Sequence, residues 1–273
     1  MQGSPWYHTV LEHTTAAVLS LLPAPSPSLK QLRACKLVGH RGTHLGTPFI
    51  ENTLPGFFAL ANTGVWGVEL DIRWTKDLVP VVSHDADCAR LFQSSINIAD
   101  VDYARLHSEV PAIPSLEAVI DAVGNKLHLM IELKDDSYPQ PPQQKQILHS
   151  LLSRLVPATD YHILALQPDL FKHVSFVPLE AQVIVGIFNV KQVSQYAQAL
   201  RCGGVAGAYP FFTKKLRALH HELGQCVGTG HINTKRLLFR EIAKGTDWIF
   251  SNRALSLQTL INTTIKAQTQ YPN

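Results

Sequence analysis

The sequence predicts a (β/α)8 TIM barrel, and three observations lead to this prediction. Eight short runs rich in Val, Ile and Leu recur along the chain, and helical patterns lie between them. Seven such connections suit parallel β/α units, because a crossover between parallel strands takes a dozen or more residues and usually holds a helix. The 238 residues from 36 to 273 also come close to the roughly 250 that these barrels typically take. An open doubly wound sheet is the alternative architecture.

The eight runs are evenly spaced with one exception. Successive runs start 20 to 34 residues apart, but 60 residues separate the second start from the third. This interval holds an extra apolar run at 79–83 and a polar stretch at 84–110, and long excursions inside compact domains are usually functional. The runs begin near Lys36, Gly67, Leu127, Tyr161, Ala181, Gly203, Gly224 and Thr246.

Residues 1–35 are predicted to form an N-terminal helical extension ahead of the barrel domain at 36–273. Trp6 to Leu22 is expected to be an amphipathic helix, and the prolines that follow it at 23, 25 and 27 are expected to form a stiff link. The near-apolar run from Ala16 to Leu22 has seven residues, whereas a membrane helix needs roughly 18 or more. Residues 1–17 hold no Lys or Arg, so no signal peptide is indicated and a cytoplasmic location is expected.

The composition excludes several classes of protein. Hydrophobic residues make up 45% of the chain and charged residues 16%, which is unlike a disordered protein. The net charge is +3 and no run of Lys or Arg exceeds two residues, so no nucleic-acid partner is expected. The four cysteines lack metal-ligand spacing and are expected to be free thiols.

Two helices and a basic surface are predicted from local patterns. Leu54–Thr63 and Thr234–Lys244 show helical spacing and are each followed by glycine. Thr53 or Asn52 is expected to cap the first of them. A basic stretch that includes Arg217 is expected to be a solvated helix face, with attraction of anionic substrates as the alternative.

Three carboxylates lie in the second and third apolar runs. Glu69 and Asp71 are two residues apart and therefore point to the same face of a strand. Glu132 lies in the third run, and buried carboxylates are costly unless they are paired or bind a metal. Three oxygen ligands suit a hard cation, Mg²⁺ or Ca²⁺. The alternatives are an exposed charged strand end and a network of Arg, Lys and carboxylates inside the barrel.

Two histidines and two cations could complete a reaction centre. His40 and His84 each close an apolar run, and histidine transfers protons efficiently near neutral pH. Arg41 and Lys134 would supply fixed positive charge for a phosphate group. The alternatives are histidines with a purely structural role, and salt bridges from both cations to the neighbouring carboxylates.

Seven short motifs follow one another along the chain. They are His40-Arg41-Gly42, Glu51-Asn52-Thr53-Leu54, Glu69-Leu70-Asp71, Thr75-Lys76-Asp77, Val81-Val82-Ser83-His84-Asp85, Ile113-Pro114-Ser115-Leu116-Glu117 and Ile131-Glu132-Leu133-Lys134. Single motifs such as His-Arg-Gly are weak, whereas the ordered set is highly specific. This set resembles one known family, the glycerophosphodiester phosphodiesterases. The resemblance spans roughly Lys36 to Arg253 and is strongest up to Lys134.

The resemblance implies a TIM barrel with a short insertion after the second strand, at about 85–111. It implies metal-dependent hydrolysis of glycerophosphodiesters to glycerol 3-phosphate and an alcohol. Related activity on lysophospholipids or phosphoinositides is one alternative, and a non-catalytic phosphodiester-binding barrel is another. By the resemblance, His40 and His84 are the catalytic pair, Arg41 and Lys134 contact the phosphate, and Glu69, Asp71 and Glu132 hold the metal.

The second half of the chain departs from the family pattern. Gly230-His231-Ile232-Asn233 stands where the family often has Trp-Thr-Val-Asn, so an aromatic wall would be absent and His231 could face the substrate instead. The alternative is a loop-facing polar role for His231. Trp248 is expected to pack in the core. An apolar rim at the barrel mouth would favour lipid substrates, and its candidates are Phe49, Phe57, Phe58, Phe92, Phe211 and Phe212.

Overall fold

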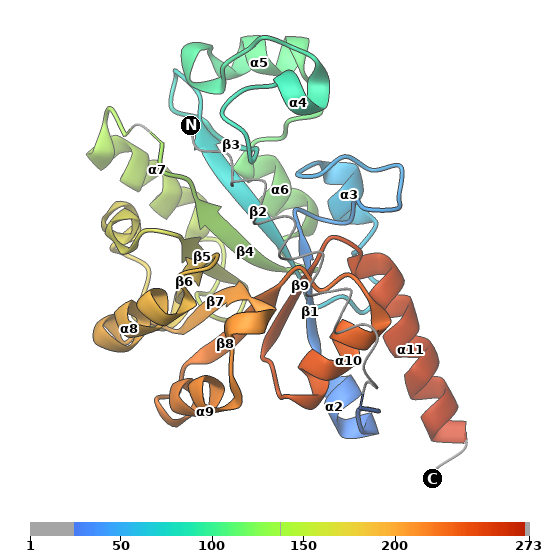
Figure 1. The fold of residues 1–273 in the computed structure, drawn as a ribbon. Helices are drawn as coiled ribbons and strands as arrows, with labels where there is room; N and C mark the ends of the chain where they lie inside the picture. The colour runs from blue at the N-terminus through green and yellow to red at the C-terminus, as the bar shows by residue number, and fades with distance from the viewer. Residues whose placement is uncertain (1–24, 137, 271–273) are drawn as a thin grey trace.

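The structure is a computed structural model that describes residues 25–136 and 138–270. Eight parallel strands follow one another in the order β1-β9-β8-β7-β6-β5-β4-β2, and β1 also pairs with β2 (Figure 1). This pairing closes the sheet, so the predicted TIM barrel is confirmed and an open sheet is excluded. The barrel strands are β1 (Lys36–His40), β2 (Gly67–Trp74), β4 (His128–Leu133), β5 (Tyr161–Ala165), β6 (Gln182–Gly186), β7 (Gly204–Ala208), β8 (Cys226–Gly230) and β9 (Trp248–Ser251).

All eight strands begin within two residues of the predicted starts. Helices surround the barrel, but the short β5–β6 connection contains only the 3₁₀ helices η2 (Pro168–Val174) and η3 (Leu179–Ala181). A third 3₁₀ helix, η4 (Tyr209–Phe211), follows β7. The α-helices are α2 (Leu29–Ala34), α3 (Leu54–Phe58), α4 (Ala89–Phe92), α5 (Tyr103–Glu109), α6 (Leu116–Val123), α7 (Pro141–Leu152), α8 (Val190–Leu200), α9 (Lys214–Glu222), α10 (Lys235–Ala243) and α11 (Ala254–Gln270).

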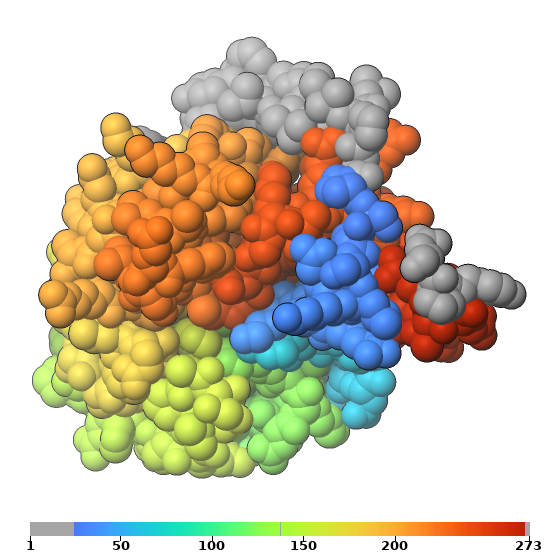
Figure 2. All heavy atoms as spheres, turned by 90° about the horizontal axis from the view of Figure 1, so that it is seen from below, coloured from blue at the N-terminus to red at the C-terminus, as the bar shows by residue number. Residues whose placement is uncertain are grey.

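The segment before β1 joins the barrel through α2. This helix packs against α10 and α11 (Figure 2). Its residue Leu32 is buried in the main core. The helix expected at Trp6–Leu22 lies outside the described residues. Within the part of the chain that the structure describes, no helix is long and apolar enough to cross a membrane.

Successive side chains of each barrel strand point alternately outward, toward the helices, and inward, toward the barrel interior. This alternation forms two hydrophobic layers and sets which polar side chains face the interior. On β2, Val68, Leu70 and Ile72 belong to the large core between the strands and the helices. Residues between them must face the barrel interior, because successive strand side chains point to opposite faces. A smaller inner core contains Trp248, as expected, together with Val38, Met130, Leu164, Val183, Ala206 and Phe250.

The long excursion between the second and third barrel strands forms a small layer of its own. Strand β3 (Pro80–Val82) pairs antiparallel with β2, and the chain then forms α4, the 3₁₀ helix η1 (Ile98–Asp100) and α5. These elements lie over one end of the barrel in Figure 1. They have a separate hydrophobic core, made of Val81, Cys88, Ile96, Ile98, Val101, Leu106, Val110 and Ile113.

Two local predictions were wrong. The helix expected at Leu54–Thr63 ends at Phe58, and the chain then turns through Asn62 in the left-handed region, with a φ of 64°. Between the helix and this residue the chain continues in hydrogen-bonded turns, in which the N–H groups of Leu60 and Ala61 both donate to the carbonyl of Phe57. Thr53 precedes α3 without capping it, because its hydroxyl donates to the carbonyl of Ile50 instead.

Arg217 is not on a solvated face, contrary to the prediction. It is 3% exposed, and its guanidinium donates to Glu241 on α10 at 2.8 Å and to the hydroxyl of Thr246 at 2.6 Å. Glu241 is 1% exposed, so both charges are removed from water together. Helical spacing in the sequence shows which residues of α9 share a face. It does not show that Arg217 points toward α10 rather than toward solvent.

Replacing Glu241 with Ala should leave Arg217 buried without its carboxylate. We expect the free energy of unfolding to fall by about 3–5 kcal/mol, as is typical when one partner of a buried ion pair is removed. The matched control is Glu109→Ala, which breaks the exposed pair between Arg105 and Glu109 and should cost about 1 kcal/mol or less. Urea denaturation of the two variants provides the comparison, and equal losses would contradict the prediction.

Two histidines lie near the amino ends of β4 and β5. Nε2 of His128 and Nδ1 of His162 are 2.7 Å apart, and the rings pack between Trp66 and Trp248. Burial, together with the charge of Lys36, lowers the pKa of His128 to about 4 and that of His162 to about 3. Both rings are therefore neutral in the folded chain at pH 7.

The fold should lose stability in mild acid because of this pair. Below pH 6.5 the unfolded chain takes up protons that the folded chain does not, so stability falls as the pH drops toward 4. Each histidine contributes up to about 1.4 kcal/mol per pH unit in that window. His162→Gln should reduce the slope of unfolding free energy against pH between 6.5 and 5, and exposed His107→Gln serves as the control. An unchanged slope in His162→Gln would show that the pair is not responsible.

Candidate functional site

Strand register brings the three predicted carboxylates together. Glu69 and Asp71 face the barrel interior from β2, and Glu132 on β4 is the register partner of Asp71. One ligand oxygen from each residue lies within 4.8 Å of the others. All three side chains are buried, which rules out the alternative of an exposed charged strand end.

Two cations offset the charge of this cluster, which is called the acidic triad below. Nζ of Lys134 lies 2.6 Å from Asp71 and also hydrogen-bonds Glu132, while Nε of Arg41 lies 3.4 Å from Asp71. The Arg, Lys and carboxylate network considered from the sequence is therefore present, and it surrounds the acidic triad. Two positive charges do not balance three negative ones.

The imbalance appears in the pKa values of the triad. Burial and the negative charges of Asp71 and Glu132 raise the pKa of Glu69 well above its usual value. Burial also raises the pKa of Glu132, although Lys134 opposes this. For Asp71 the effects of Lys134 and Arg41 outweigh burial, so its pKa is lowered. The site therefore favours an added positive charge.

The acidic triad has the chemistry to hold a divalent cation. Oε1 of Glu69 is buried and has no hydrogen-bond partner, although Oε2 accepts the backbone N–H of Arg41 at 3.0 Å. A buried carboxylate oxygen without a donor is costly unless a cation binds it. Carboxylate oxygens are the ligands that hard divalent cations prefer.

The loop after β1 lies over the acidic triad because two of its residues adopt the left-handed backbone conformation. Arg41 and Gly42 have φ values of 56° and 85°, and this turn directs Arg41 back toward the triad. The amide of Asn52 donates to Asp71 at 2.8 Å, and Glu51 accepts from Arg41 at 3.1 Å. The Glu51-Asn52 motif thus scaffolds this loop.

His40 ends β1 beside the acidic triad. It is the register partner of Glu69, and its Nε2 lies 3.8 Å from that carboxylate. Its Nδ1 lies 2.6 Å from Oδ1 of Asn252, so Nδ1 carries the proton and Nε2 is left for chemistry. Burial, with Arg41 and His231, lowers the pKa of His40 to about 3.

His84 follows β3 and is held by two contacts. Its Nδ1 lies 2.8 Å from Oδ1 of Asp85, and its backbone carbonyl accepts two bonds from Arg73 at 2.9 and 2.7 Å. Arg73 also pairs with Asp136 beyond β4. Burial and the charge of Lys134 lower the pKa of His84.

Asn252 and Arg73 were not assigned to the site from the sequence. Arg73 lies two residues beyond Asp71, so strand alternation alone could have placed it on the same face. Asn252 follows the last strand, where polar residues of a barrel gather. Its contact with His40 joins residues 212 positions apart, and no local pattern indicates that contact.

His231 lies at the mouth of the barrel beside His40. It follows β8, is exposed and has a φ of 63°, and the ring centroids of the two histidines are 6.0 Å apart. The residue is therefore next to the candidate site.

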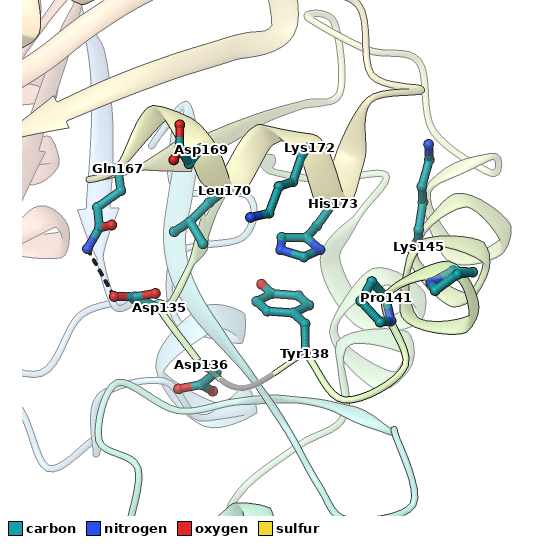
Figure 3. A pocket seen from close by; sticks show the side chains of 11 residues that line it. Asp135, Asp136, Tyr138, Pro141, Lys145, Gln167, Asp169, Leu170, Lys172 and His173 are labelled. Atoms are coloured by element: carbon teal, nitrogen blue, oxygen red, sulfur yellow. Dashed lines mark hydrogen bonds between the residues drawn. The ribbon is translucent and has the colours of Figure 1, made fainter.

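An open cleft of about 670 Å³ lies between the loop after β4 and η2 (Figure 3). The rings of Tyr138 and His173 stack 3.6 Å apart within it, and Gln167 donates to Asp135 at its edge. Neither the two candidate histidines nor the acidic triad lines this cleft. One of its lining residues, Asp136, pairs with Arg73, which donates to the backbone carbonyl of His84.

Comparison with known proteins identifies one family, which matches most of the barrel. The model of the glycerophosphoryl diester phosphodiesterase family matches residues 40–220. A glycerophosphodiester phosphodiesterase of Bacillus altitudinis is 28% identical over 240 residues, which is 80% of this chain and 94% of that protein. Glycerophosphodiester phosphodiesterase 1 of Mus musculus is 33% identical over 130 residues, 40% of this chain and 39% of that protein.

Solved structures share the fold. A phosphodiesterase of Oleispira antarctica, determined in complex with the product sn-glycerol-3-phosphate, superposes with a TM-score of 0.70 at 19% identity. That match covers 83% of this chain and 96% of the other. A glycerophosphodiester phosphodiesterase of Thermotoga maritima gives a TM-score of 0.69 at 21% identity, over 83% and 98% of the chains.

A divalent cation should stabilise the chain through the acidic triad. At 100 times its dissociation constant a bound ion adds about 2.7 kcal/mol to the free energy of unfolding, so the melting temperature should rise. Glu69→Gln should abolish the rise, whereas Glu117→Gln on the exposed face of α6 should keep it. Thermal unfolding with Mg²⁺ and Ca²⁺ in parallel, supported by calorimetric titration, measures the effect. A rise that persists in Glu69→Gln would place the ion elsewhere.

Proposed function

The chain belongs to the glycerophosphoryl diester phosphodiesterase family and is a phosphodiesterase, and from this premise we propose that it hydrolyses glycerophosphodiesters to glycerol 3-phosphate and an alcohol. The observation that carries the proposal is the placement of two histidines beside a buried acidic triad at one end of the barrel. Active sites of TIM barrels lie at this carboxyl-terminal end of the strands.

The acidic triad and two cations would bind the phosphodiester. Glu69, Asp71 and Glu132 would hold a divalent metal, Mg²⁺ or Ca²⁺, whose charge polarises the phosphoryl oxygens. Arg41 and Lys134 would stabilise negative charge on the phosphate, a role supported by their position over the triad.

His40 and His84 would move the protons. One ring takes the proton of the attacking hydroxyl as a new P–O bond forms, and the other protonates the alcohol oxygen as its bond to phosphorus breaks. In both residues Nδ1 is already engaged, by Asn252 and by Asp85, which leaves both Nε2 atoms for this exchange. The attacking hydroxyl is either water or the substrate's own glycerol hydroxyl, and detection of a cyclic phosphate would identify the second route.

His231 is proposed to contact the substrate. It is exposed beside His40 at the barrel mouth, where the chain departs from the family's aromatic segment. A polar ring at this position would bind a polar part of the substrate.

A second candidate substrate class, the lysophospholipids, is favoured by one observation. Leu166, Ile187 and Phe211 follow β5, β6 and β7, and they are 38%, 44% and 37% exposed. Of the six phenylalanines expected at a rim, Phe57 and Phe212 are instead buried in the core. Exposed apolar side chains after three neighbouring strands would suit an acyl chain.

The decisive test is hydrolysis of glycerophosphocholine by purified protein with Mg²⁺ or Ca²⁺. We expect release of glycerol 3-phosphate that EDTA abolishes. His40→Ala and His84→Ala should each lower kcat by about 10²–10⁴-fold, the usual contribution of a general acid or base. His107→Ala, an exposed histidine on α5, should retain activity.

The outcomes separate the alternatives. Turnover that survives EDTA and both histidine substitutions would refute the mechanism. Binding of glycerophosphocholine without product would support the non-catalytic barrel. Faster turnover of lysophosphatidylcholine than of glycerophosphocholine would favour the lipid substrate, and this preference should weaken in Ile187→Ser.

A further inference from the structure

Arg90 is an arginine of the insertion whose guanidinium joins two loops of the catalytic end. Its Nε donates to Oδ2 of Asp85 and its Nη2 to Oε1 of Glu51, each at 2.5 Å. Asp85 holds His84, and Glu51 holds Arg41. One chain of polar contacts therefore runs between the loop after β1 and the loop after β3, and Arg90 is its central link.

The insertion fixes the backbone from which Arg90 projects. Cys88 before it is 1% exposed in the small core of the insertion, and Phe92 after it packs on the same core. The carboxylate of Asp87 accepts the backbone N–H of Ala89 at 2.9 Å at the start of α4. The backbone of Arg90 is therefore anchored on both sides. The Arg90 side chain itself is 48% exposed.

The two contacts made by Asp85 are complementary. One carboxylate oxygen accepts from the imidazole of His84 and the other accepts from Arg90, so the arginine sets the orientation of the carboxylate. A carboxylate that accepts from Nδ1 keeps the proton on that nitrogen and leaves Nε2 as the reactive atom. Although burial raises the pKa of Asp85, the bonds from Arg90 and His84 lower it overall.

We propose that Arg90 is a positioning residue for His84, which it orients through Asp85 while tying the His84 loop to the Arg41 loop through Glu51. The inference rests on the proposed function for its catalytic consequence. A lysine could not replace the arginine fully, because a planar guanidinium contacts two carboxylates in fixed geometry and an ammonium is a single point of charge.

The test compares Arg90→Ala and Arg90→Lys with the matched control Arg105→Ala. Arg105 lies on α5 of the same insertion and pairs only with the exposed Glu109 among the described residues. Arg90→Ala should lower kcat by about 10–100-fold, the usual cost of losing an orienting partner, with KM changed less than about twofold. Arg90→Lys should fall between Arg90→Ala and wild type, and Arg105→Ala should match wild type. Melting temperatures should stay close together, because the Arg90 side chain is half exposed and the buried Glu51 keeps its hydrogen bond from Arg41.

NMR of the histidine rings tests the inference without an activity measurement. In ¹⁵N spectra of the histidine rings at pH 8, with His84 assigned from His84→Gln, wild type and Arg105→Ala should show the Nδ1–H tautomer. Arg90→Ala should show a mixture of both tautomers. If wild-type protein hydrolyses no glycerophosphodiester, the proposed function fails and the spectra still test the positioning role.

Three results would overturn the inference. An unchanged kcat in Arg90→Ala would do so, as would an unchanged His84 tautomer. A rise in KM alone would show that Arg90 binds the substrate directly.

Discussion

The repulsion among three buried carboxylates is the constraint on which the catalytic end of this barrel depends. Glu69, Asp71 and Glu132 converge because strand register leaves them no other direction, and the inner face of the barrel offers them little water. Lys134 and Arg41 offset part of the charge, and Asn52 supplies a neutral donor. The remaining deficit of positive charge makes the site receptive to a divalent cation, at a cost in stability that functional sites commonly carry.

The surrounding loops follow from that centre. The left-handed turn at Arg41 and Gly42 returns the loop after β1 toward the carboxylates, and His40 leaves the strand directly opposite Glu69. The loop after β3 carries His84. A neutral amide, Asn252, holds Nδ1 of His40, and a carboxylate, Asp85, holds Nδ1 of His84. The insertion belongs to the same arrangement, because Arg90 connects it to both loops through Glu51 and Asp85.

Local pattern predicted the barrel strands well and the helices less well. Strand starts fell within two residues of the predictions, because short apolar runs rich in Val, Ile and Leu are a local property of strands that are buried on both faces. The end of α3 was misplaced because the segment after Phe58 continues in tight hydrogen-bonded turns, and its sequence pattern looks helical. Arg217 was misread because its partner Glu241 lies on another helix, and periodicity reports which residues share a face without reporting what covers that face.

The sequence by itself determined the fold class through its eight apolar runs, and the family through its ordered set of motifs. It also determined that Glu69, Asp71 and Glu132 cluster, because alternation along a strand is encoded locally and consecutive strands of a barrel lie side by side. Only the tertiary structure decided which groups hold the two histidines. Asn252 meets His40 across 212 positions of sequence, and Arg90 meets Glu51 across 39. Contacts of this kind depend on how the closed barrel and its insertion place distant segments, and no local period carries that information.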